Sequence, residues 1–226
     1  VRKSALRTLD AFVQQLEVAA PERRSEWVHA FCRAIWDRGV PEPVQQPLLV
    51  RVILPELRRG YEAQRTPYAR WIAQFRQEIW GSWRQSLGAL GFSEFWAEDL
   101  LREALRLDPH DSLARRELIS VLESALDYYI HEVPSGVLAE PHTFRQELAE
   151  FEQLVAIEGL TDRYERALGE WRFHCEEWAR YLEQRDQFLD YEEYLSRSVR
   201  SGRKRTPRRT PGCGHGSPDE HPGATK

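Results

Sequence analysis

Apolar side chains recur at steps of three and four residues along most of the chain, while strict alternation of apolar and polar positions is almost absent. The first such stretch covers residues 4–19 and places five apolar side chains on one helical face, namely Leu6, Leu9, Phe12, Val13 and Leu16. These steps fit the turn of an α-helix, whereas a half-buried strand alternates every second residue. The pattern therefore predicts an all-α protein, a bundle of about eight antiparallel helices.

Prolines and glycines indicate where the first helices end. Pro21 suits the first turn of a second helix, which we expect to end near Gly39. Residues 48–65 allow two interpretations, a helix that starts or kinks at Pro55 or a buried strand. We favour the helix, because the chain offers no second strand for pairing.

Further helices are expected over about residues 67–88, 94–107, 112–131, 143–157, from 161 onward, and 186–199. Asp111 or Ser112 is the expected N-cap of the helix at 112, and Thr161 that of the helix at 161, because their side-chain oxygens can accept a free backbone N–H. Thr143 and Gln146 match a capping box.

The helix that starts at Thr161 has the most regular apolar seam. Its members alternate steps of four and three: Tyr164, Leu168, Trp171, Cys175, Trp178 and Leu182. Such a seam packs along a neighbouring helix, with side chains of one helix fitting between those of the other. The seam is short and its aromatic rings are bulky for a two-stranded coiled coil, so we expect it to pack within the chain.

One segment resembles a known family. Ala97 and Ala104 stand seven residues apart, Pro109 follows five residues later, and Leu118 lies in the next helix. This spacing resembles the second helix and closing turn of a tetratricopeptide (TPR) unit, and the resemblance covers about residues 94–122. Alanines allow close helix crossing, and the proline ends the helix. Because no second copy follows at the TPR period, the resemblance implies a single TPR-like hairpin rather than a repeat array.

Charge is distributed unevenly along the chain. Residues 1–139 have a net charge of −1, residues 140–196 of −9 and residues 197–226 of +6. Large apolar residues disappear after Ser201, so that nothing offsets the entropy of ordering. We predict one helical domain over residues 1–200, with a candidate sub-boundary near 134–142, and a disordered basic tail over 201–226.

Neither a membrane span nor a secretory signal is evident. No apolar run approaches the roughly 20 residues that cross a bilayer. Cys32 and Cys175 lie on apolar helix faces, where free cysteine acts as a small hydrophobe. With Cys213 they make an odd number without the spacing of a zinc site. We expect a cytoplasmic protein that does not contact membranes.

Two charged surfaces and one aromatic side chain are candidates for binding. The acidic block would attract a basic protein, and its candidate contact residues are Glu170, Glu176, Glu177, Glu183, Asp186 and Asp190. Trp96, just ahead of the TPR-like hairpin, is a candidate anchor for a partner. The tail is a second candidate surface, either for phosphates or an acidic partner or merely as a solvated segment, through Arg203, Lys204, Arg205, Arg208 and Arg209.

Candidate chemistry is limited to two acid–histidine pairs. Asp127 and His131 are four residues apart, as are Glu170 and His174, so that each pair shares a helix face and two such helices could hold a metal. Helical metal sites more often space glutamate and histidine by three, which favours packed or surface histidines here. We predict no metal and no cofactor.

These observations predict a non-enzymatic helical module that binds another protein, either as an adaptor or as a toxin-neutralising (immunity-like) protein. Two alternatives stay open: a metal-binding enzyme built on the acid–histidine pairs, and a nucleic-acid-associated protein acting through the tail. The oligomeric state is left open as well.

Overall fold

The computed structural model describes residues 2–39, 44–75 and 96–202. All regular structure in these ranges is helical, which confirms the all-α prediction. In chain order the elements are α1 (Arg2–Val18), α2 (Pro21–Cys32), η1 (Arg33–Asp37), α3 (Gln46–Leu48), η2 (Leu49–Ile53), α4 (Leu54–Glu62), α5 (Tyr68–Gln74), α8 (Ala97–Leu107), α9 (Ser112–Ile130), α10 (Pro141–Ile157), α11 (Thr161–Glu183), η3 (Arg185–Gln187) and α12 (Tyr191–Gly202).

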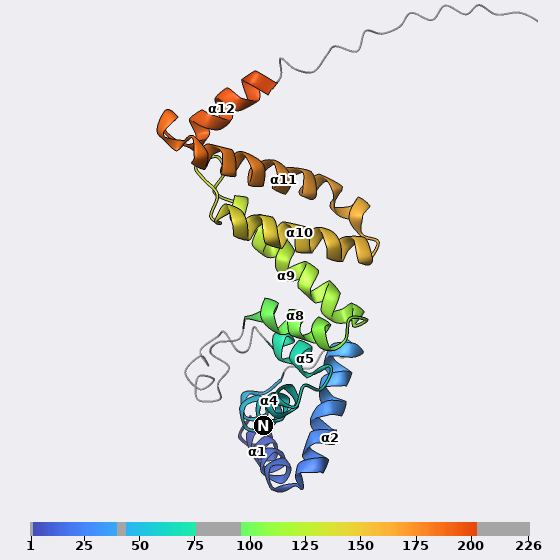
Figure 1. The fold of residues 1–226 in the computed structure, drawn as a ribbon. Helices are drawn as coiled ribbons and strands as arrows, with labels where there is room; N and C mark the ends of the chain where they lie inside the picture. The colour runs from blue at the N-terminus through green and yellow to red at the C-terminus, as the bar shows by residue number, and fades with distance from the viewer. Residues whose placement is uncertain (1, 40–43, 76–95, 203–226) are drawn as a thin grey trace, which may run out of the picture.

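The helices form an elongated stack, with α1 and α2 at one end and α12 at the other (Figure 1). From α4 to α12, each helix packs mainly against the helices described before and after it in the chain. A continuous apolar core runs through the stack and includes the two largest buried side chains, Trp71 and Trp171. Within the described ranges, no helix is both long and apolar enough to cross a membrane.

The ambiguous stretch around Pro55 is a helix, as we favoured. Five residues of π-helix, η2, precede α4 directly, and Pro55 lies in the first turn of α4. Proline has no N–H and its ring clashes with the carbonyl four residues earlier, so the chain needs a wider turn there. The strand alternative is wrong, because a helix with a local widening already accommodates the proline.

The predicted seam of α11 packs within the chain. Tyr164, Leu168, Trp171 and Cys175 are buried. The ring of Phe151 in α10 lies edge-on to both Tyr164 and Trp171, with ring centres 5.1 Å apart in each pair. Cys32 and Cys175 are buried free thiols, as predicted for small apolar residues, and burial raises the pKa of both.

Several predicted helix starts differ from the observed ones. The carboxylate of Asp111 accepts the backbone N–H of the second and third residues of α9, which confirms the N-cap. The capping box at Thr143 is wrong, because α10 already begins at Pro141, whose fixed φ suits the first helical position. Thr161 is the first residue of α11 rather than its cap. The last helix begins at Tyr191 instead of 186.

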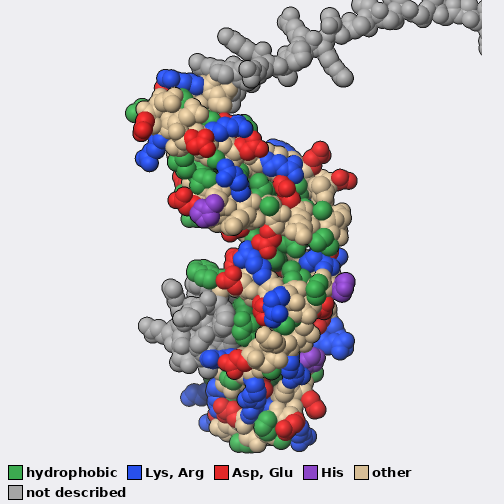
Figure 2. Space-filling model, in the orientation of Figure 1, with side chains coloured by type: hydrophobic (Ala, Val, Ile, Leu, Met, Phe, Trp, Pro, Cys, Tyr) green, Lys and Arg blue, Asp and Glu red, His purple; other side chains and the backbone are tan. Residues whose placement is uncertain are grey.

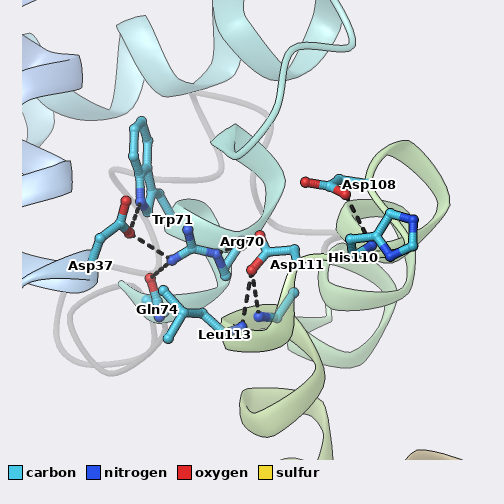
Figure 3. A network of polar contacts seen from close by, with 9 residues as sticks. Asp37, Arg70, Trp71, Gln74, Asp108, His110, Asp111 and Leu113 are labelled. Carbon is cyan, nitrogen blue, oxygen red and sulfur yellow. Dashed lines mark hydrogen bonds and ion pairs between the residues drawn. The ribbon is translucent and has the colours of Figure 1, made fainter. Parts of the chain in front are cut away.

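A buried ion-pair network connects the N-terminal helices to the hairpin of α8 and α9 (Figure 3). Arg70 of α5 is only 3% exposed, and its guanidinium donates to Asp37 at 2.9 Å and to Asp111 at 2.8 Å. Asp37, at the end of η1, also accepts the Trp71 indole N–H at 3.1 Å. Because Asp111 also caps α9, one arginine fixes the position of three elements.

Candidate interaction surface

The TPR-like segment forms a hairpin of α8 and α9. Ala97, Ala104 and Leu118 are all buried, while Pro109 lies in the exposed turn. The membership of this hairpin in the TPR family stays a prediction. Trp96 immediately precedes α8 and is 59% exposed, so its ring is accessible for contact with a partner.

Five of the six predicted acidic contact residues lie at the surface. Those exposed are Glu170, Glu176, Glu183, Asp186 and Asp190. Glu177 is different, because it is 6% exposed and points into the junction of α11 and α12. Its carboxylate accepts hydrogen bonds from the hydroxyls of Tyr194 at 2.8 Å and Ser198 at 3.1 Å, and it pairs with Arg180. Glu177 therefore holds α12 against α11 and is not available to a partner.

Two carboxylates of α10 and the one directly after it are neutralised by arginines of neighbouring helices. Glu150 pairs with Arg102 of α8 at 2.8 Å, and Glu152 pairs with Arg172 of α11 at 2.7 Å. Glu158 accepts from two arginines at the start of α9, Arg115 at 2.7 Å and Arg116 at 3.0 Å. On the face shown in Figure 2, acidic and basic side chains are accordingly interspersed along the stack.

The carboxylates at the turn between α11 and α12, residues 184–190, have no such partners. Glu183 and Asp186 make no ion pair with a described residue. Asp190 accepts only a backbone N–H, that of Glu193 at 2.8 Å, and so caps α12. Asp190 thereby sets the start of α12. Asp162, Glu165 and Glu170 of α11 are also exposed and form no ion pair with a described residue, so the turn is one of two stretches of the acidic block whose charge is not neutralised by a neighbour.

A hollow of about 810 Å³ adjoins the same turn. It lies between the α11–α12 turn and the connector of α9 and α10, residues 131–140, and we call it the connector hollow. Its floor contains the rings of Trp178, Tyr181 and Tyr191. Carboxylates and leucines occur among its lining residues, and these are Glu140, Asp186, Asp190, Leu138 and Leu189.

The floor of the connector hollow is a packed aromatic cluster. Trp178 stacks on Tyr181 with ring centres 5.3 Å apart and lies edge-on to Tyr191 at 5.0 Å. The Trp178 indole N–H donates to the carbonyl of Ala139 at 3.2 Å, which ties the connector to α11. This cluster gives the hollow a fixed base, because rings packed edge to face and stacked resist displacement.

The phenols next to Glu177 differ in their partners. Burial, the hydrogen bond to Glu177 and its negative charge raise the pKa of Tyr194 to about 12. Burial and the same charge raise the pKa of Tyr191, but the buried hydroxyl of Tyr191 has no hydrogen-bond partner. Both groups are therefore neutral phenols at pH 7. The hydroxyl of Tyr194 has a hydrogen-bond partner and that of Tyr191 has none.

The acid–histidine pairs do not form a metal-binding group in the described residues. The Asp127 carboxylate accepts the indole N–H of Trp171 at 3.1 Å. His131 stacks on Tyr128, with ring centres 5.0 Å apart. Burial lowers the pKa of His174, which favours a neutral ring. Nowhere in the described ranges do three or more His, Cys, Asp or Glu side chains come together as ligands would.

The connector hollow was missed from sequence, and so were three of its members, Leu138, Glu140 and Leu189. The predicted contacts Asp186 and Asp190 do line it, whereas the basic tail residues lie outside the described residues. A signal was present for Leu138 alone, since it stands in the predicted break near 134–142, whereas Leu189 was placed inside the predicted helix over 186–199. Apolar residues in loops are candidates for partner contact when polar neighbours surround them.

No protein-family model, curated protein or solved structure shows significant similarity to this chain. The function is therefore argued from the surface itself.

Proposed function

We propose that this chain is a non-enzymatic protein-interaction module that binds a basic partner through the acidic turn between α11 and α12. An adaptor and a toxin-neutralising protein, both in the cytoplasm, are the two forms of this proposal. The observation that carries it is that Asp186 and Asp190, which form no ion pair with a described residue, both line the connector hollow, whereas the unpaired Asp162 and Glu165 at the other end of α11 do not.

Unpaired surface carboxylates near one another attract cations, and the attraction is screened by salt over about 8–10 Å at ordinary ionic strength. Such a patch raises the association rate of an oppositely charged partner more than it slows dissociation. A basic toxin or another cationic protein fits this description. Nucleic acid does not, because phosphate would be repelled by the same carboxylates.

The test compares two charge-neutralised variants of the full chain. Asp186→Asn/Asp190→Asn removes two carboxylates at the turn, and asparagine keeps the cap of α12 because its amide oxygen still accepts a backbone N–H. Asp162→Asn/Glu165→Gln removes two exposed carboxylates at the other end of α11 and serves as the matched control. Fluorescence anisotropy with a labelled nona-arginine peptide measures binding at 50 and 200 mM salt.

We expect the turn variant to bind nona-arginine about three- to tenfold more weakly at low salt, since exposed pairs contribute on the order of 0.2–1 kcal/mol each. The control variant should bind like the parent chain. Equal losses in the two variants would show general charge attraction instead of a site, and no binding of the peptide at 50 mM salt would contradict the proposal altogether.

A further inference from the structure

We infer that the connector hollow is the docking site for the basic partner, and that it accepts an extended segment carrying an apolar side chain next to a basic one. This inference rests on the proposed function and specifies its site and ligand.

Two leucines from separate loops are exposed at the hollow. Leu138 of the connector is 46% exposed and Leu189 of the α11–α12 turn is 88% exposed, although the floor beside them is buried. Covering apolar surface is favourable by about 25 cal/mol for each Å² removed from water. An extended segment with apolar side chains laid along the hollow would cover both leucines.

The charge around the leucines specifies the rest of the segment. Glu140, Asp186 and Asp190 contribute carboxylates to the lining, against one guanidinium, that of Arg185. The hollow is therefore acidic at neutral pH and complementary to lysine or arginine.

Hydrogen bonds hold both leucines in place. The Leu138 amide donates to the carbonyl of Tyr129 at 2.9 Å, and the Leu189 amide donates to the Glu193 carboxylate at 2.7 Å. The neighbouring Ala139 carbonyl accepts from Trp178. A surface that is already ordered loses little conformational entropy on binding, so these side chains are presented at low cost.

A separate partner matches this site better than the basic tail of the same chain. Residues 203–226 carry positive charge but contain no Leu, Ile, Val, Phe, Tyr or Trp. The tail is complementary to the carboxylates alone, whereas the leucines require an apolar neighbour. We therefore assign the hollow to a basic segment of another protein.

The test uses two labelled decapeptides of equal charge, one alternating arginine with leucine and the other arginine with serine. Anisotropy titrations compare the parent chain with Leu138→Ser/Leu189→Ser, and Ile157→Ser is the control because Ile157 is 58% exposed at the far end of α10. The parent chain should prefer the leucine peptide by about tenfold. The preference should vanish in the double variant and persist in the control, with unchanged helical content in circular dichroism.

The outcomes separate this inference from the proposed function. If both peptides bind the parent chain equally, or if the double variant keeps the preference, the hollow is not the docking site while the acidic turn still binds cations. If neither peptide binds, the proposed function fails first. A full-length variant with serine at Arg203, Lys204, Arg205, Arg208 and Arg209 should bind the leucine peptide with unchanged affinity, because the tail does not occupy the hollow. An affinity that rises about tenfold would instead assign the hollow to the tail and overturn the inference.

Discussion

The two ends of the stack use their charged residues differently. Residues 2–75 bury charge inside the core, where Glu56 and Arg70 are each 3% exposed. Residues 96–202 keep most of theirs at the surface, paired between helices along α10 and left unpaired at the α11–α12 turn. The exceptions in this second region are Glu177 and Glu158, whose side chains are 7% and 6% exposed, and Asp111, at 11%.

This difference separates charges that fix the fold from charges that can bind. A buried ion is tolerated only with good partners, so it specifies one arrangement of the elements around it. Glu56 pairs with Arg24 of α2 and with Arg59 of its own helix at 2.9 Å, and thereby ties α4 to α2. Exposed carboxylates make no such demand on the fold. Residues 96–202 keep most of their charged side chains at the surface, and it is therefore in this region that surface charge is available to bind a partner.

The largest expected effect comes from removing the buried arginine. Arg70→Met leaves the carboxylates of Asp37 and Asp111 without their shared cation, and breaking a buried pair in this way costs about 3–5 kcal/mol of unfolding free energy. Urea denaturation measures the loss. The matched control is Arg172→Met, which breaks an exposed pair with Glu152 and should cost less than about 1 kcal/mol. Equal losses would erase the distinction between the two regions.

Two glycines in helices provide a second contrast. A Cβ on Gly60 of α4 would lie 2.2 Å from the Tyr68 ring, which is buried and cannot move away. Gly60→Ala should therefore destabilise the protein by about 1–3 kcal/mol, as overpacking does.

A Cβ added to Gly169 of α11 would have no other atom within 4 Å, apart from its chain neighbours and the backbone of its own helix. Gly169→Ala should stabilise the protein by about 0.5–1 kcal/mol, because alanine restricts the unfolded chain and favours helix. Thermal melts of the two variants decide the contrast. A destabilised Gly169→Ala would indicate that the middle of α11 is more closely packed than its exposure shows.

The helical fold could be predicted from sequence because the apolar spacing of each helix is a local property. The seam from Tyr164 to Cys175 identified the core face of α11. Details that depend on backbone geometry could not be predicted in the same way. The π-helical turn before Pro55 and the start of α10 at Pro141 are such cases, since several caps and turns compete for each boundary.

The site was predicted only in part, for a reason that lies in α12. A seam specifies one neighbouring face, but α11 is covered on a second side by α12, which buries Glu177 and Tyr181. The sequence carried no signal for that second contact, so Glu177 was grouped with the exposed acids. The connector hollow depends on two loops about 50 residues apart, and their proximity is a tertiary property that periodicity does not encode.

The last contrast tests which hydrogen bonds stabilise the buried carboxylate of Glu177. Tyr194→Phe removes a hydrogen bond to Glu177 that measures 2.8 Å, but Ser198 and Arg180 still donate to that carboxylate, so the loss should be about 1 kcal/mol. Tyr191→Phe removes a buried hydroxyl that has no partner, so it should stabilise the protein, by about 1 kcal/mol, because the unpaired group no longer has to be taken out of water.

Urea denaturation of the two phenylalanine variants compares neighbouring rings whose centres are 6.0 Å apart, so the apolar surroundings are nearly the same. A greater loss for Tyr194→Phe assigns the stabilisation to the hydrogen bond with Glu177 and not to ring packing. Equal losses would mean that the Tyr191 hydroxyl is already satisfied in solution.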